Sequence, residues 1–140
     1  IGKLFPEVVV KEQACPMWVP LVEYGESDKP GADYFVRRYT EELIKADPEI
    51  DTLILGCTHY PLLRPKIREA LPESVRLISQ GELVATSLAD YLQRHPEMEC
   101  RLSQGGEISY RTTECPDKFE ELASIFTGTE VDAVRIKLGS

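Results

Sequence analysis

Apolar and polar positions follow two different periods along the chain. A helical period of three to four residues runs from Ala32 to Leu43 and predicts an amphipathic helix. A short apolar run follows at 50–55 and stops at Gly56, which is typical of a buried strand in a parallel sheet. The apolar face of the predicted helix consists of Ala32, Phe35, Val36, Tyr39 and Leu43.

The rest of the chain continues this alternation, with glycine and proline at the boundaries. Ser79 and Glu82 have the spacing of a capping box that opens a helix. Pro116 and Gly128 are typical of the start and end of a further helix. Alternating strands and helices predict an α/β fold with a parallel sheet. The expected strands are 8–10, 50–55, 75–78, 108–112 and 131–136, and the expected helices are 32–43, 64–70, 80–94 and 116–127.

Residues 14–23 do not fit either period. Their sequence, Ala-Cys-Pro-Met-Trp-Val-Pro-Leu-Val-Glu, contains two prolines. Because proline interrupts regular backbone hydrogen bonding, we interpret this segment as a rigid extended loop. No internal repeat, low-complexity segment or compositional linker divides the chain.

The composition of the chain limits the kinds of partner that it is expected to bind. The 140 residues carry a formal net charge of −8, and no cluster of lysine and arginine forms the basic face that nucleic-acid binding needs. No apolar stretch approaches the ~20 residues of a membrane span, and no signal peptide is visible. We therefore expect neither a nucleic-acid nor a membrane partner. The first residue is isoleucine, so we expect the native N-terminus to lie elsewhere.

The four cysteines do not have the spacing of a metal ribbon or of a redox motif. None forms a C-x-x-C pair, and the chain lacks the loop-rich character of disulfide scaffolds. We expect reduced thiols and a cytoplasmic location. Cys15, before a proline, is expected to be packed, and Cys100 and Cys115 lie in polar surroundings without a motif.

Cys57 is the strongest candidate for chemistry. It follows the expected strand at 50–55 directly after Gly56, and a turn and helix start follow it. Ligands of open α/β sheets bind at this carboxyl edge, and a helix N-terminus lowers the pKa of a thiol. His59 is two residues away, so in an extended segment both side chains face the same side. The alternatives are a small buried hydrophobic cysteine and a structural histidine.

Glu23 is a weaker candidate, since a glutamate at a loop end is usually solvated. It gains importance only if its segment lies opposite Cys57. A zinc site built from Cys57 and His59 would need Cys15 or Glu23 as further ligands, at no recognised spacing. No phosphate loop or dinucleotide motif occurs, so we expect no metal and no cofactor.

Several segments resemble a known family. Leu-Gly-Cys-Thr-His-Tyr-Pro-Leu-Leu at 55–63 is similar to the second catalytic signature of glutamate racemases, within the aspartate/glutamate racemase superfamily. The segment at 14–23 resembles another part of these enzymes. Leu-Ile-Ser-Gln-Gly-Glu at 77–82 and Tyr-Arg-Thr-Thr at 110–113 also fit, so the resemblance covers almost the whole chain.

The resemblance implies a fold of two pseudo-symmetric, flavodoxin-like lobes, each supplying one catalytic cysteine. It implies that Cys57 is the catalytic cysteine of the second lobe and that His59 assists proton transfer there. It also implies that Glu23 is a glutamate of the same catalytic site and that Thr58 contacts the substrate. It further implies cofactor-independent interconversion of L- and D-glutamate for peptidoglycan. Family members often dimerise, so the resemblance is compatible with a homodimer, although the sequence itself does not indicate an oligomeric state.

The family's first-lobe motifs, of Asp-Ser-Gly and Ala-Cys-Asn-Thr type, are absent. The resemblance therefore implies that the chain is about the second half of the enzyme. Residues 1–78 are expected to belong to the second lobe, and residues 79–140 to return to the first. Since inversion of a stereocentre needs one base on each face of the carbon, we expect the chain alone to be inactive.

Two alternatives stay open. The chain could be a non-catalytic ligand-binding module that keeps one wall of a cleft, and the reactivity of Cys57 separates this interpretation from an enzyme. It could also belong to a racemase for aspartate or another amino acid, because sequence physics does not distinguish substrates that differ by one methylene.

Overall fold

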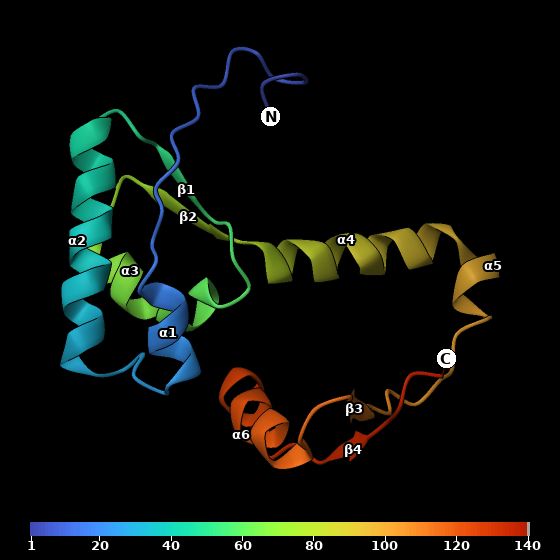
Figure 1. Ribbon diagram of the computed structural model, residues 1–140. Helices are drawn as coiled ribbons and strands as arrows, with labels where there is room; N and C mark the ends of the chain where they lie inside the picture. The colour runs from blue at the N-terminus through green and yellow to red at the C-terminus, as the bar shows by residue number, and fades with distance from the viewer. Residues whose placement is uncertain (140) are drawn as a thin grey trace. The chain divides into compact units, whose positions relative to one another are not determined.

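The computed structural model describes residues 1–139 and has mixed helices and strands (Figure 1). The α/β class expected from the sequence is confirmed, and both strand pairs are parallel. The chain divides into two compact units, residues 1–81 and 82–140. The elements are α1 (Trp18–Glu23), α2 (Pro30–Ala46), β1 (Thr52–Leu55), a 3-10 helix η1 (Tyr60–Leu63), α3 (Arg64–Ala70), β2 (Arg76–Ser79), α4 (Gln80–Arg94), α5 (Pro96–Glu99), β3 (Tyr110–Thr112), α6 (Pro116–Thr127) and β4 (Ala133–Arg135).

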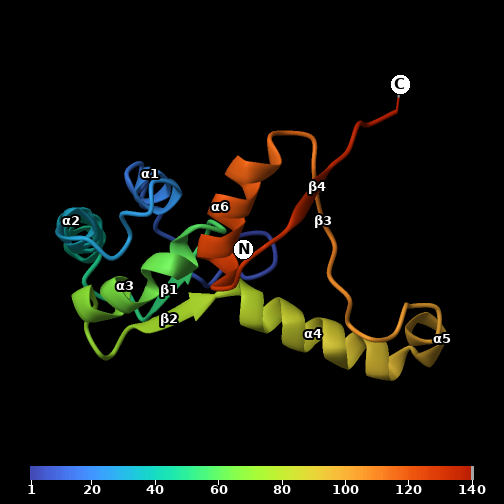
Figure 2. The same cartoon turned by 90° about the horizontal axis from the view of Figure 1, so that it is seen from below.

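The first unit is built on the parallel pair β1 and β2, in which Leu53 lies opposite Leu77. Alternate β1 side chains point to opposite faces, so Leu53 and Leu55 are buried while Ile54 is 51% exposed. The helices α1, α2 and α3 lie on the buried side (Figures 1 and 2). Their contribution to the core consists of Trp18, Leu21, Val22, Ala32, Val36, Tyr39 and Ile67.

The helix α2 confirms the prediction from the apolar period at 32–43. Ala32, Val36 and Tyr39 are buried, and Phe35 and Leu43 pack against the same core. Proline at the first helical position suits this start, because its fixed φ is already helical and its missing N–H has no intrahelical partner there.

The extended loop expected at 14–23 is wrong in its second half. Residues Trp18–Glu23 form α1, with Pro20 at the third helical position. Proline is tolerated there because the first four N–H groups of a helix have no intrahelical acceptor. Trp18, Leu21 and Val22 are buried, so core packing stabilises this short helix.

The strand expected at 8–10 is also absent. Residues 8–10 form no strand and are exposed, with Val9 at 77%. Strand propensity is satisfied only when a neighbouring strand accepts the backbone hydrogen bonds, and no described residue pairs with this segment.

The second unit contains the parallel pair β3 and β4, in which Arg111 lies opposite Val134. The helix α6 ends at Gly128, whose φ of 70° is the left-handed conformation that favours glycine after a helix. The short helix α5 is not expected from the sequence, whereas α4 has the bounds 80–94 that the sequence predicts. Among residues 1–139, no helix has the length and apolar content to cross a membrane.

Candidate active site

Cys57 lies two residues beyond the carboxyl end of β1. Gly56 ends the strand, and Cys57 opens the turn that leads into η1. The thiol is only half-buried, whereas the preceding Leu55 is 2% exposed. The strand thus places a reachable sulfur at the sheet edge where parallel α/β folds bind ligands.

His59 contacts Cys57 directly. Its Nδ1 lies 3.7 Å from the sulfur of Cys57 and 3.4 Å from Oγ1 of Thr58. The extended geometry expected for 57–59 is wrong, since His59 has helical angles, φ −78° and ψ −31°. The two side chains still meet because the turn folds the imidazole back onto the sulfur.

Glu23 reaches the same turn from α1. Its Oε1 hydrogen-bonds Nε2 of His59, and the two side chains are 36% and 22% exposed. The sequence condition for Glu23, that its segment lie opposite Cys57, is therefore met. Glu23, His59 and Cys57 form one continuous hydrogen-bonded row.

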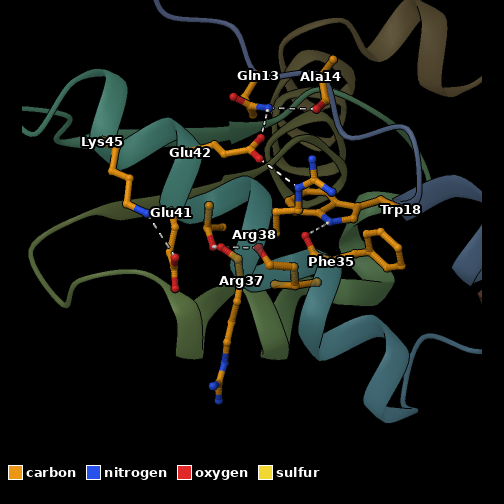
Figure 3. Close-up of polar contacts among 11 residues, drawn as sticks. Gln13, Ala14, Trp18, Phe35, Arg37, Arg38, Glu41, Glu42 and Lys45 are labelled. Carbon is orange, nitrogen blue, oxygen red and sulfur yellow. Dashed lines mark hydrogen bonds and ion pairs between the residues drawn. The ribbon is translucent and has the colours of Figure 1, made fainter.

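Two aromatic residues hold the elements of this row together. Trp18, at the start of α1, packs edge-on against Tyr60 of η1, with ring centroids 4.8 Å apart. Its indole N–H donates to the carbonyl of Phe35 in α2 at 3.4 Å (Figure 3). Neither Trp18 nor Tyr60 stands out from the sequence as a site residue, although both lie within the two long motifs. Position in a motif was the only available signal.

The electrostatics favour ionisation of the thiol. Burial alone raises the pKa of Cys57, but hydrogen bonds from the backbone and imidazole of His59 and from the backbone of Tyr60 outweigh it and lower the pKa from 9.0. The hydrogen bond to Glu23 raises the pKa of His59, against a smaller opposing effect of burial. Each shift stabilises the charged form of its group.

The row can act as a proton-transfer chain. The Glu23 carboxylate accepts from Nε2–H of His59, which leaves Nδ1 as the acceptor for the Cys57 proton. Loss of the thiol proton to Nδ1 produces a thiolate beside an imidazolium that Glu23 stabilises. Within residues 1–139, no group of three or more His, Cys, Asp or Glu side chains is arranged to hold a metal ion.

The chain is similar in sequence to curated glutamate racemases. It is 41% identical over 124 residues to the glutamate racemase of Ruegeria pomeroyi, which covers 89% of this chain and 44% of the relative. The chain spans about half the length of the curated relatives it matches. No family model matches the chain.

Solved structures agree with the sequence similarity. A glutamate racemase from Thermus thermophilus in complex with β-chloro-D-alanine aligns with a TM-score of 0.75 at 35% identity, over 96% of this chain and 51% of that one. A glutamate racemase from Francisella tularensis in complex with D-glutamate aligns with a TM-score of 0.80 at 25% identity, over 97% and 50%.

The fold is accordingly the flavodoxin-like α/β fold of the two-lobed racemases, which are isomerases. Over nearly its whole length the chain is similar to glutamate racemases, of which it spans about half.

Proposed function

We propose that this chain supplies one of the two proton-transferring bases of a glutamate racemase, and that Cys57 is this base. The observation that carries the proposal is the row from Glu23 through His59 to Cys57, at the carboxyl end of β1. The family relationship supports glutamate as the substrate, since the Francisella tularensis relative is described in complex with D-glutamate.

The proposed step is a proton exchange at the α-carbon. The Cys57 thiolate removes the α-proton from one face and becomes a thiol, while the thiol of a second base on the opposite face delivers a proton and becomes a thiolate. A lowered pKa suits both directions, because the same group must hold and release a proton near neutral pH. No oxidant, reductant or cofactor is needed for this balance.

The other site residues have distinct parts in the proposal. His59 accepts the Cys57 proton before the substrate reacts, and Glu23 fixes the imidazole ring through Nε2. Thr58 is exposed beside this row and offers a hydroxyl to the substrate. Glu23 is thus a positioning residue, whereas Cys57 acts on the substrate itself.

The proposal extends to the arrangement and setting of the whole protein. Residues 1–78 belong to the second lobe, and residues 79–140 return to a first lobe that the chain does not contain. An exposed apolar set on α4 supports this return, because it offers a surface for that lobe to cover. The exposed α4 side chains are Leu83, Val84, Leu88 and Tyr91.

We further propose a cytoplasmic enzyme that supplies D-glutamate for peptidoglycan and that can form a homodimer.

The test is racemisation of D-glutamate followed by circular dichroism. The chain alone should show no turnover above Cys57→Ala, because only one of the two bases is present. When the chain is co-produced with the half of the Ruegeria pomeroyi enzyme that it does not match, turnover should appear and Cys57→Ala should abolish it. Turnover by the chain alone contradicts the two-base argument. An assembled enzyme without turnover favours the binding-module alternative.

A further inference from the structure

A groove in the first unit follows β1, and Gly56 and Tyr60, which flank the turn of Cys57 and His59, are among its lining residues. Its volume is about 890 Å³. One wall is the segment 7–13, the other is the segment 49–56 that contains β1, and the floor includes Tyr39, Thr40 and Leu43 of α2. The groove therefore has two backbone walls and a largely apolar floor.

The β1 wall is an open strand edge. Within residues 1–139, β1 pairs only with β2. The residues that line the groove include all of β1 and none of β2, so the groove follows the edge of β1 that faces away from β2. An open edge offers a row of backbone N–H and C=O groups to a further strand.

The opposite wall, the segment 7–13, has residues typical of a β-strand, but no described strand pairs with it. Val8, Val9 and Val10 are β-branched and exposed at 47%, 77% and 49%. The segment is held in place at its far end, where Nε2 of Gln13 donates to Glu42 of α2 at 3.3 Å (Figure 3).

Both walls run toward the same end of the groove. The segment 7–13 leads into Trp18 and β1 leads into Tyr60, and these two rings are in contact. A strand placed between the walls can therefore be parallel to both. It would complete the hydrogen bonding of β1 and convert residues 8–10 into the strand that their sequence predicts.

The charge of the walls indicates which strand fits. The rim carries five carboxylates against one lysine, and three of the carboxylates lie just before β1, at the end where a parallel strand would begin. A lysine or arginine before the incoming strand would be complementary, whereas a second copy of this chain would bring another acidic wall. The charged residues of the rim are Glu7, Glu12, Asp47, Glu49 and Asp51, with Lys11.

We propose that this groove receives a parallel β-strand from the half of the racemase that this chain does not span, with a basic residue at the start of the strand. The inference rests on the proposed function for the identity of the partner. It is supported by the length of the curated relatives, about half of which lies outside the match. The groove is thus an assembly surface, and its lining residues do not include Cys57, His59 or Glu23.

The test uses the 140-residue chain co-produced with the half of the Ruegeria pomeroyi racemase outside the match. Light scattering after size exclusion should show a 1:1 complex. The double variant Val9→Pro/Val10→Pro should weaken the complex at least tenfold, because successive N–H groups of an extended segment point to opposite sides and one of the two faces the groove. The control Gly2→Pro introduces proline at an exposed position outside the groove and should retain the complex.

Hydrogen exchange on the same samples tests independently whether the incoming strand pairs with β1. The amides of 53–55 should gain protection in the complex with the unchanged chain and with Gly2→Pro, but not with the double variant. A circular dichroism melt of the double variant should match that of the unchanged chain, since the structure gives no backbone hydrogen bond from N–H of Val9 or Val10.

Three results would overturn the inference: no complex at 100 μM, a complex that the double variant leaves intact, or a homodimer of the chain alone that the double variant breaks. Because binding is measured without turnover, a complex through this groove that fails to racemise counts against the proposed function only. Conversely, a result that excludes the groove contact does not contradict the proposed role of Cys57.

Discussion

Two cysteines of the first unit have the same chemistry and opposite environments. Cys15 is 7% exposed, and burial, with a smaller contribution from the charge of Glu42, raises its pKa to about 12. Cys57 is half-buried, and its hydrogen bonds to His59 outweigh burial and lower its pKa. At neutral pH the first thiol is a packing group, whereas the second is poised to ionise.

This contrast predicts the pH dependence of alkylation. Iodoacetamide reacts with the thiolate, so half-maximal labelling of Cys57 should occur below pH 9.0, and His59→Ala should move it to higher pH. Labelling is measured peptide by peptide in a mass spectrometer, with Cys15 as an unreactive internal reference. A Cys57 profile that does not move in His59→Ala would contradict the role of the imidazole.

At the scale of elements, α2 has a start that its sequence leaves incomplete. Lys29 has the extended angles of an N-cap residue, φ −85° and ψ 162°, but no side-chain hydrogen bond caps the helix. A lysine offers no acceptor to the first N–H groups, and its charge is unfavourable at the positive end of a helix. The helix depends instead on Pro30 and on its buried face.

Lys29→Asp should therefore stabilise the chain by about 0.5–1 kcal/mol, because the carboxylate can accept from a free N–H of the first turn and suits the helix dipole. The matched variant Lys45→Asp places the same charge in the last turn and removes the ion pair with Glu41, so it should destabilise by a similar amount. Urea denaturation measures the change in unfolding free energy for both variants. Changes of the same sign would contradict the argument from the helix dipole.

The elements also show where sequence reasoning stops. The apolar period was sufficient for the existence of α2, although the helix extends beyond 32–43 at both ends, and the expected bounds 64–70 are those of α3. They failed at Trp18–Glu23, where core packing stabilises a helix despite Pro20. They failed again at 8–10, where a strand needs a neighbour that the described chain does not supply. The meeting of Cys57 and His59 was expected, but on an extended backbone that the turn does not have.

At the scale of the whole molecule, stability is concentrated in the first unit. Of the residues that the structure describes, fourteen hydrophobic ones are buried, and all but Val131 belong to residues 1–81. The spacing of apolar residues along each helix cannot reveal this imbalance, because α4 and α6 are about as amphipathic as α2 and yet have no buried residue. What an apolar face covers depends on its partner, which lies outside its own sequence.

Ile67→Ala should therefore cost about 2–5 kcal/mol of unfolding free energy, since Ile67 is fully buried in the first core. Val9→Ala, at a position 77% exposed in the same unit, should change it by less than about 0.5 kcal/mol. Urea titrations followed by circular dichroism report both values. Similar losses for the two variants would show that the first unit lacks a specific core.

The contact between Trp18 and Tyr60 has a practical consequence. Trp18 is the one tryptophan of the sequence, it is 3% exposed, and its neighbour Tyr60 follows His59 directly. The chain therefore contains a single native indole fluorophore beside the turn that carries Cys57. Changes in emission can follow occupancy or alkylation of that turn in real time, without any attached dye.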